Sequence, residues 1–374
     1  MTPTEVIHRD FLNFGDLGFV RAPIQRLSTG GTPYFTLEPI GMPRIPPDVL
    51  NTVCYLYKSV EDALEGKDFG GTAFFMAVES EVPGLAVVYA VTNWHVAVRG
   101  GASVLRVNRL DGDTDIFDYG PENWEFDPKY DIAVVHVPLK KDKHAFKLIP
   151  LSAIVDQKNI DDAKLGPGDD VFMVGRFIDH DGVSVNRPAV RFGNISVMPA
   201  PIKQPNGIMA DAYCIDLHSR SGYSGSPVFV YRTPGYDLED VQKTNDLSKR
   251  HVLLSGTNYL GFLGIHFAQF PEQWEIGTEE IPEKEGHVPL IRTGQYVKGL
   301  SGMTCVLPAW SIREVLNMPK VKEKRTQSDE MLRKQLTAKG QMPPLAEVAT
   351  ANDENPQHRA DFNSLVGAAA RKQQ

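Results

Sequence analysis

Cysteine is scarce in this 374-residue sequence. Cys54, Cys214 and Cys305 are its only three cysteines, and they lie far apart. An odd number of widely spaced cysteines cannot build a disulfide framework, and no paired CxxC spacing indicates a metal site. We expect buried free thiols that act as small hydrophobic side chains, with no metal or cofactor. This cysteine usage favours a reducing, cytoplasmic compartment.

Long hydrophobic runs and an excess of positive charge are also missing. No run of about 18 apolar residues occurs, so we expect no membrane-spanning segment. The first residues are acidic and polar where a signal peptide needs an apolar stretch. Lys and Arg number 39 against 47 Asp and Glu, a net charge of −8. Because nucleic-acid binders usually carry a basic footprint, we expect neither a membrane nor a nucleic-acid partner.

Glycine and proline are abundant, with 32 and 27 residues. Between these breakers lie short apolar runs rich in Val, Tyr, Phe and Ala, in two successive sets of similar size. This pattern favours short β-strands over long helices. Two sets of strands that must hide their edges predict an all-β fold of two antiparallel β-barrels.

The chain divides into four predicted segments. Residues 1–50 form an extended N-terminal arm, 51–150 the first barrel, and 151–318 the second barrel with a closing helix. Residues 319–374 form a mobile, charged tail, with one helical stretch at 328–339. The end of that tail is either a short amphipathic helix that docks on the body or on a partner, or a disordered terminus.

Three short strings carry candidate chemistry. VTNWHV places His95 at the end of an apolar strand, YDIAVV places Asp131 at the start of one, and SGYSGSPVF places Ser224 in a glycine-flanked turn before another. Asp127 is a second carboxylate near the middle string, but it precedes a proline and lacks the apolar continuation. His95, Asp131 and Ser224 are therefore the candidate catalytic residues.

These residue types suit nucleophilic catalysis. A serine hydroxyl attacks poorly unless a neutral imidazole accepts its proton, and a carboxylate on the other ring nitrogen fixes the required tautomer. Gly222 and Gly225 allow a tight turn at Ser224. The backbone amides of Gly222 and Ser224 could then form an oxyanion hole.

Together with GTAFF at 71–75, these strings resemble the motifs of the chymotrypsin-like (trypsin-type) serine peptidases, in the order His, Asp, Ser. The resemblance covers roughly 70–315. It implies two Greek-key β-barrels with the active site in the cleft between them. It also implies an endopeptidase that cleaves protein or peptide substrates through an acyl-enzyme.

The sequence departs from that family at the residue before the nucleophile. Many secreted members are activated when a new N-terminus pairs with an aspartate there, whereas this chain has Tyr223 and no IVGG-like start. An inserted N-terminus could not form that ion pair. We therefore predict that the uncut chain has a formed oxyanion hole, unless a regulatory partner controls it.

The expected substrate pocket also differs from that of trypsin. The position six residues before the nucleophile is His218 rather than aspartate, and Ser219 follows it. His266 matches the histidine of the glutamyl-endopeptidase branch, so Glu, Asp or Gln at P1 is the predicted preference. Alternatively, His266 is a core residue and the pocket accepts a small apolar side chain.

Two other classes of function stay open. The chain could be a protease-like binding module whose cleft or tail recognises another protein. It could also be a latent protease, even one with a chaperone-like role, that a partner protein switches on. An esterase with a GxSxG elbow is disfavoured, because a helix would follow its serine, whereas PVFVYR is typical of a strand.

Overall fold

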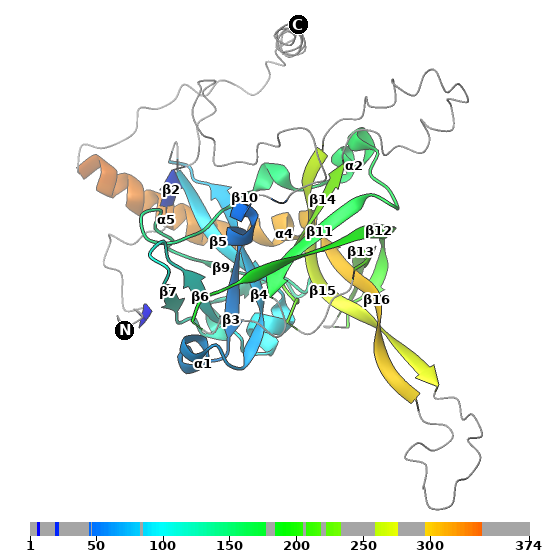
Figure 1. The fold of residues 1–374 in the computed structure, drawn as a ribbon. Coiled ribbons are helices and arrows are strands. Elements are labelled where there is room, and N and C mark those ends of the chain that lie inside the picture. The colour runs from blue at the N-terminus through cyan, green and yellow to red at the C-terminus, as the bar shows by residue number, and fades with distance from the viewer. Residues whose placement is uncertain are drawn as a thin grey trace, which may run out of the picture.

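The computed structural model describes the following residues: 6–7, 19–21, 45, 47–82, 85–176, 184–204, 207–217, 222–232, 259–275 and 296–338. These residues form two β-sheets, one from each half of the chain (Figure 1). Most of the predicted N-terminal arm and the end of the tail lie outside the described residues. The division into four segments, the tail's mobility and its terminal helix therefore stay predictions.

The first sheet has ten described strands, in the order β1-β7-β6-β3-β4-β5-β9-β8, with β2 paired to β5 and β10 paired to β4. Their bounds are β1 Val6–Ile7, β2 Phe19–Arg21, β3 Val53–Tyr57, β4 Phe69–Glu79, β5 Leu85–Thr92, β6 Val104–Asn108, β7 Thr114–Phe117, β8 Glu125–Phe126, β9 Ala133–His136 and β10 Ile149–Pro150. Most neighbours are antiparallel, whereas the short strands β1 and β10 pair in parallel.

The second sheet is a closed barrel in the order β11-β12-β13-β16-β15-β14. Its strands are β11 Asp170–Arg176, β12 Pro188–Lys203, β13 Met209–Asp216, β14 Pro227–Arg232, β15 Tyr259–Glu275 and β16 Tyr296–Pro308. All described pairs are antiparallel. The predicted all-β fold with two successive sets of strands is thus confirmed, and the second set closes into a barrel.

Strand β4 shows how the two sheets share a core. Its side chains alternate between two apolar clusters, as a strand buried on both faces requires. Phe74 and Met76 belong to the cluster that also holds residues of the second barrel, and Phe74 packs edge-on against Phe262 of β15 at 5.3 Å. Ala73 and Phe75 belong to a cluster within the first half. Burial of one face of β4 against β15 fixes the docking of the two sheets.

Short helices connect or close the sheets: α1 Val60–Glu65, α2 Gln157–Ala163, α4 Ala309–Leu316 and α5 Pro319–Ala338, with the helical turns η1 Pro47–Thr52, η2 His95–Arg99, η3 Pro121–Asn123 and η4 Leu151–Ala153. Helix α4 is the predicted closing helix, and its buried face joins the shared core. None of the described helices is long and apolar enough to cross a membrane.

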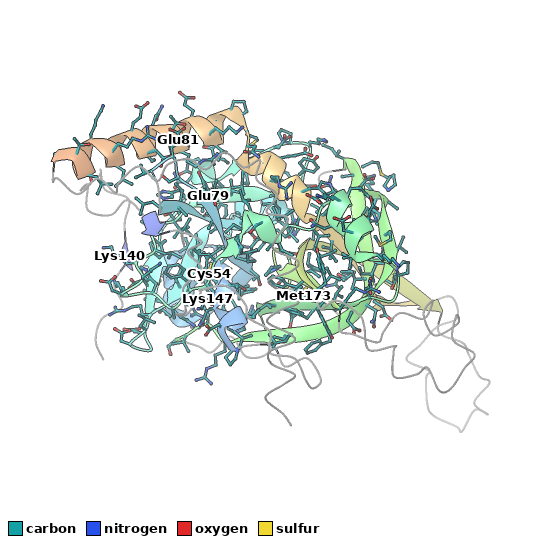
Figure 2. All side chains as sticks on the ribbon, turned by 90° about the horizontal axis from the view of Figure 1, so that it is seen from above. Cys54, Glu79, Glu81, Lys140, Lys147 and Met173 are labelled. Carbon is teal, nitrogen blue, oxygen red and sulfur yellow. The ribbon has the colours of Figure 1, made fainter. Side chains whose placement is uncertain are left out.

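Helix α5 begins earlier than the helical stretch expected at 328–339, and it lies along the first sheet (Figures 1 and 2). Its buried Asp329 accepts hydrogen bonds from the hydroxyl of Ser80, at 2.5 Å, and from the amide of Glu81, at 3.0 Å. Lys320 pairs with Glu125 of β8 at 2.8 Å. The sequence pattern alone is too polar to reveal these anchors.

The three cysteines are free and buried, as expected. Burial raises the pKa of the Cys305 thiol to about 12, so it stays protonated at neutral pH.

Candidate active site

His95 and Asp131 form a close pair between β5 and β9. His95 starts the turn η2 three residues after the end of β5, and Asp131 lies just before β9, the strand that pairs with β5. One carboxylate oxygen, Oδ2, lies 2.5 Å from Nδ1 of the imidazole, and the other, Oδ1, accepts the His95 amide at 2.8 Å. Asp131 is fully buried. Because both oxygens are engaged by one residue, the ring is fixed in place and in tautomer.

Asp127, the competing carboxylate in the sequence, does not take this position. Its Oδ1 instead caps the local turn by accepting the amide of Lys129 at 2.8 Å.

Two buried amide side chains support Asp131, and sequence reasoning gave neither of them a role. The side chain of Asn93 donates to the Asp131 carbonyl at 2.9 Å. Gln204, which follows β12 in the second half, accepts the Asp131 amide at 2.7 Å and donates to the carbonyl of Lys129 at 3.1 Å. Asn93 lies within the VTNWHV string and could have been noticed there. Gln204 is far away in the sequence, which gives no signal for its contact.

Ser224 lies in a tight turn that leads into β14. Gly222 and Gly225 both have positive φ, +94° and +88°, which glycine adopts without strain. A Cβ at Gly225 would lie 1.9 Å from the carbonyl oxygen of Thr72 and 2.4 Å from the Thr92 hydroxyl. The turn therefore needs glycine at residue 225 both for its conformation and for space.

Thr72 of β4 attaches this turn to the first sheet. Its amide donates to the Ser224 carbonyl at 2.9 Å, and its hydroxyl donates to the Gly222 carbonyl at 3.2 Å. On the other side, the Gly225 amide donates to the carbonyl of His266 at 3.0 Å. The serine turn is thus bonded to both sheets through its backbone.

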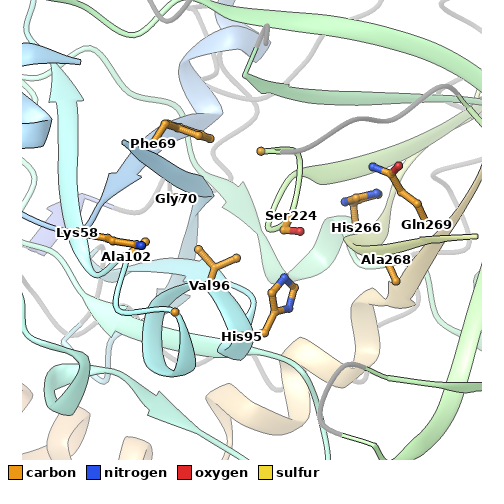
Figure 3. Close-up of a pocket in the computed structure, with 12 residues that line it drawn as sticks. Lys58, Phe69, Gly70, His95, Val96, Ala102, Ser224, His266, Ala268 and Gln269 are labelled. Carbon is orange, nitrogen blue, oxygen red and sulfur yellow. The ribbon is translucent and has the colours of Figure 1, made fainter. Parts of the chain in front are cut away.

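One pocket is lined by candidate residues from both halves of the chain. His95, Gly222, Ser224 and His266 all line a cavity of about 690 Å³ (Figure 3). His95 comes from the first half of the chain, whereas the other three come from the second. The remaining lining residues are Lys58, Phe69, Gly70, Val96, Gly100, Ala102, Ala268 and Gln269.

His266 lines this pocket although it is only 1% exposed. Burial lowers its pKa to about 3, against an opposing hydrogen bond with the backbone of Tyr223. The imidazole is therefore neutral at physiological pH. His218 and Ser219, the other predicted pocket residues, lie outside the described residues.

Within the part of the chain that the structure describes, no group of three or more His, Cys, Asp or Glu side chains could hold a metal ion.

No protein-family model and no curated protein matches the chain. Among solved structures, it is similar to the MamO protease domain from Magnetospirillum magneticum, with 14% identity and a TM-score of 0.39 over 72% of this chain and 97% of that one. It is also similar to the HtrA-type protease AlgW with decapeptide, with 18% identity and a TM-score of 0.39 over 71% and 63% of the two chains. A third similar structure is Deg5, with 18% identity and a TM-score of 0.32 over 56% and 92%.

Proposed function

We propose that this chain is a serine endopeptidase that cleaves protein or peptide substrates through an acyl-enzyme on Ser224. The observation that carries the proposal is the pairing of Asp131 with His95 in the pocket that Ser224 also lines. Such a pair activates a neighbouring hydroxyl, and the pocket leaves room for a peptide.

In this mechanism His95 is the general base and then the general acid. Its Nδ1 proton is donated to Asp131, so the Nε2 lone pair is free to accept the Ser224 proton. The Ser224 oxygen attacks the scissile carbonyl, and His95 passes the proton to the leaving amine. Water then repeats the cycle on the acyl-enzyme and releases the acid product. Asp131 stabilises the transient imidazolium throughout.

The amides of Gly222 and Ser224 are the proposed oxyanion hole. Their carbonyl oxygens bond to Thr72, which fixes the orientation of the turn. Fixed amide dipoles stabilise the developing negative charge better than mobile water does.

We further propose that His218, Ser219 and His266 line the P1 pocket and favour Glu, Asp or Gln, as in the glutamyl-endopeptidase branch. The position of His266 in the cavity supports this assignment. Its neutral imidazole supplies a hydrogen bond but no positive charge, which favours the carboxamide of Gln within that set. A preference for a small apolar residue is the alternative.

The proposed setting is the cytoplasm, without a cofactor and without membrane or nucleic-acid partners. The main alternative is a protease-like binding module, or a latent protease that a regulatory partner protein activates.

Intact-mass spectrometry after treatment with a fluorophosphonate probe tests the proposal. We expect one adduct on the wild type and on Ser328→Ala, a control on α5, which contributes no lining residue to the pocket, and none on Ser224→Ala. Peptides with Gln, Glu, Lys and Leu at P1 then test the pocket. If the folded wild type takes up no probe, the proposal that the free chain is an active peptidase is overturned. The binding-module or latent-protease alternative is then favoured.

A further inference from the structure

Arg191 of β12 contacts the residue immediately before the candidate nucleophile. Tyr223 is fully buried, and its hydroxyl accepts a hydrogen bond from Nε of Arg191 at 2.6 Å. The guanidinium carbon of Arg191 also lies 4.8 Å from the centre of the Tyr223 ring. One cation thus engages both the polar tip and the aromatic face of the same side chain.

The ring of Tyr223 has little freedom to move away. Gly175 of β11 faces it, and a Cβ at Gly175 would lie 2.9 Å from Cδ1 of Tyr223 and 2.2 Å from the hydroxyl oxygen of Ser226. Strand β11 pairs directly with β12, which carries Arg191. The ring of Tyr223 is therefore held between Gly175 of β11 and the guanidinium of Arg191.

The backbone of Tyr223 connects this contact to the proposed chemistry. Its carbonyl accepts the Ser226 amide at 3.0 Å, which closes the turn, and its backbone also hydrogen-bonds with His266. The peptide that follows Tyr223 carries the Ser224 amide, and the Gly222 amide lies just upstream. Any rotation of Tyr223 would redirect both amides.

We infer that Arg191 is a positioning residue that acts through Tyr223 to hold the serine turn with both amides directed at the pocket. The inference rests on the proposed function of Ser224. The buried phenol oxygen of Tyr223 needs a hydrogen-bond partner, and Arg191 supplies a donor from within the chain. The turn is then competent without cleavage of the polypeptide.

Steady-state kinetics on a peptide substrate test the inference. Arg191→Met removes the charge and the donors, and we expect kcat to fall at least about tenfold with KM within twofold, because the oxyanion contacts act mainly in the transition state. Arg191→Lys should recover kcat to within about threefold of the wild type. The exposed Arg187→Met is the matched control and should leave both constants unchanged.

Tyr223→Phe keeps the ring and removes the acceptor, so it completes a double-mutant cycle. We expect it to lower kcat, and we expect Arg191→Met to add less than twofold in that background, since both changes break the same hydrogen bond and the positioning is assigned to that bond. An unchanged kcat in Arg191→Met, a loss in KM alone, no recovery in Arg191→Lys, or additive losses would overturn the inference.

Two measurements separate this inference from the proposed function. Probe labelling of wild-type Ser224 tests the function itself. Hydrogen exchange of a peptide spanning residues 222–228 tests the positioning without activity: exchange should rise in Arg191→Met and not in Arg187→Met. If the wild type is not labelled but shows this exchange difference, an active free peptidase is refuted and the positioning role stands. If the wild type is labelled but Arg191→Met has the same exchange and the same kcat as the wild type, only the positioning role is refuted.

Discussion

The two halves of the candidate site are held in different ways. In the first half, the side chains of His95 and Asp131 bond directly to each other. In the second half, the Ser224 turn is held mostly through its backbone, by Thr72 and by β15. Side-chain pairing tolerates small backbone shifts, whereas a turn of defined φ does not. The candidate acid–base pair is therefore specified locally, within the first half, and the candidate nucleophile depends on its surroundings.

Each half is nevertheless secured by a residue from the other. Gln204, from the second half, holds the Asp131 backbone, and Thr72, from the first sheet, holds the Ser224 turn. The candidate site is thus complete only when the two sheets are docked, which couples the proposed catalysis to the shared core around β4.

The largest expected effect comes from a change in the His95–Asp131 pair of the first half. Asp131→Asn keeps the shape of the side chain but can present only one acceptor, so His95 loses its enforced tautomer. We expect kcat/KM for a peptide substrate to fall by about 10⁴-fold, as is typical of a triad that loses its carboxylate. Asp127→Asn is the control and should stay within about threefold of the wild type. Equal losses in both variants would reject the assignment of Asp131.

Gly225→Ala perturbs the Ser224 turn, which depends on contacts from other parts of the chain. The new methyl group would meet the Thr72 carbonyl in a left-handed conformation, so we expect the free energy of unfolding to fall by about 3 kcal/mol. Gly112→Ala is the matched control, because Gly112 has the same φ of +88° and nothing within 4 Å of the added Cβ. We expect the control to lose only about 1 kcal/mol. Urea unfolding measures both, and similar losses would show that the Thr72 contact does not constrain the turn.

The sequence predicted the locally specified features well. Alternating apolar runs and turn residues indicated the strands. The three strings at strand ends named His95 and Ser224, which line one pocket, and Asp131, which pairs with His95. Gln204 and Arg191 could not be predicted, because their contacts depend on how distant segments dock rather than on local pattern. The early start of α5 has the same cause, since its first turn contacts the first sheet through the pair of Lys320 with Glu125.

Gln204→Ala tests the contact that crosses from the second half to Asp131. It leaves the buried Asp131 amide without an acceptor, which costs about 1–3 kcal/mol of stability. We also expect kcat to fall about tenfold, because the carboxylate loses its fixed backbone. The exposed Gln327→Ala on α5 should change neither quantity. A loss of stability with unchanged kcat would mean that His95 alone positions Asp131.

The smallest expected effect concerns the histidines of the two halves. His266 has a pKa near 3 when folded and about 6.5 when unfolded, so the unfolded chain binds an extra proton between these values. The stabilisation is present above pH 6.5 and is lost as pH falls: at pH 5.5 the free energy of unfolding drops by about 1.4 kcal/mol relative to neutral pH. His266→Gln removes this contribution. Urea titrations at pH 7.5 and 5.5 give the change in the free energy of unfolding for each protein, and that change should be larger in the wild type by about 1.4 kcal/mol.

The pH dependence that remains in the variant includes His144 of the first half. Burial lowers the pKa of His144 as well, although a hydrogen bond to Asp115 opposes the shift. An identical pH dependence in the two proteins would mean that His266 already takes up its proton in the folded state, and the argument for Gln over Glu at P1 would fall with it.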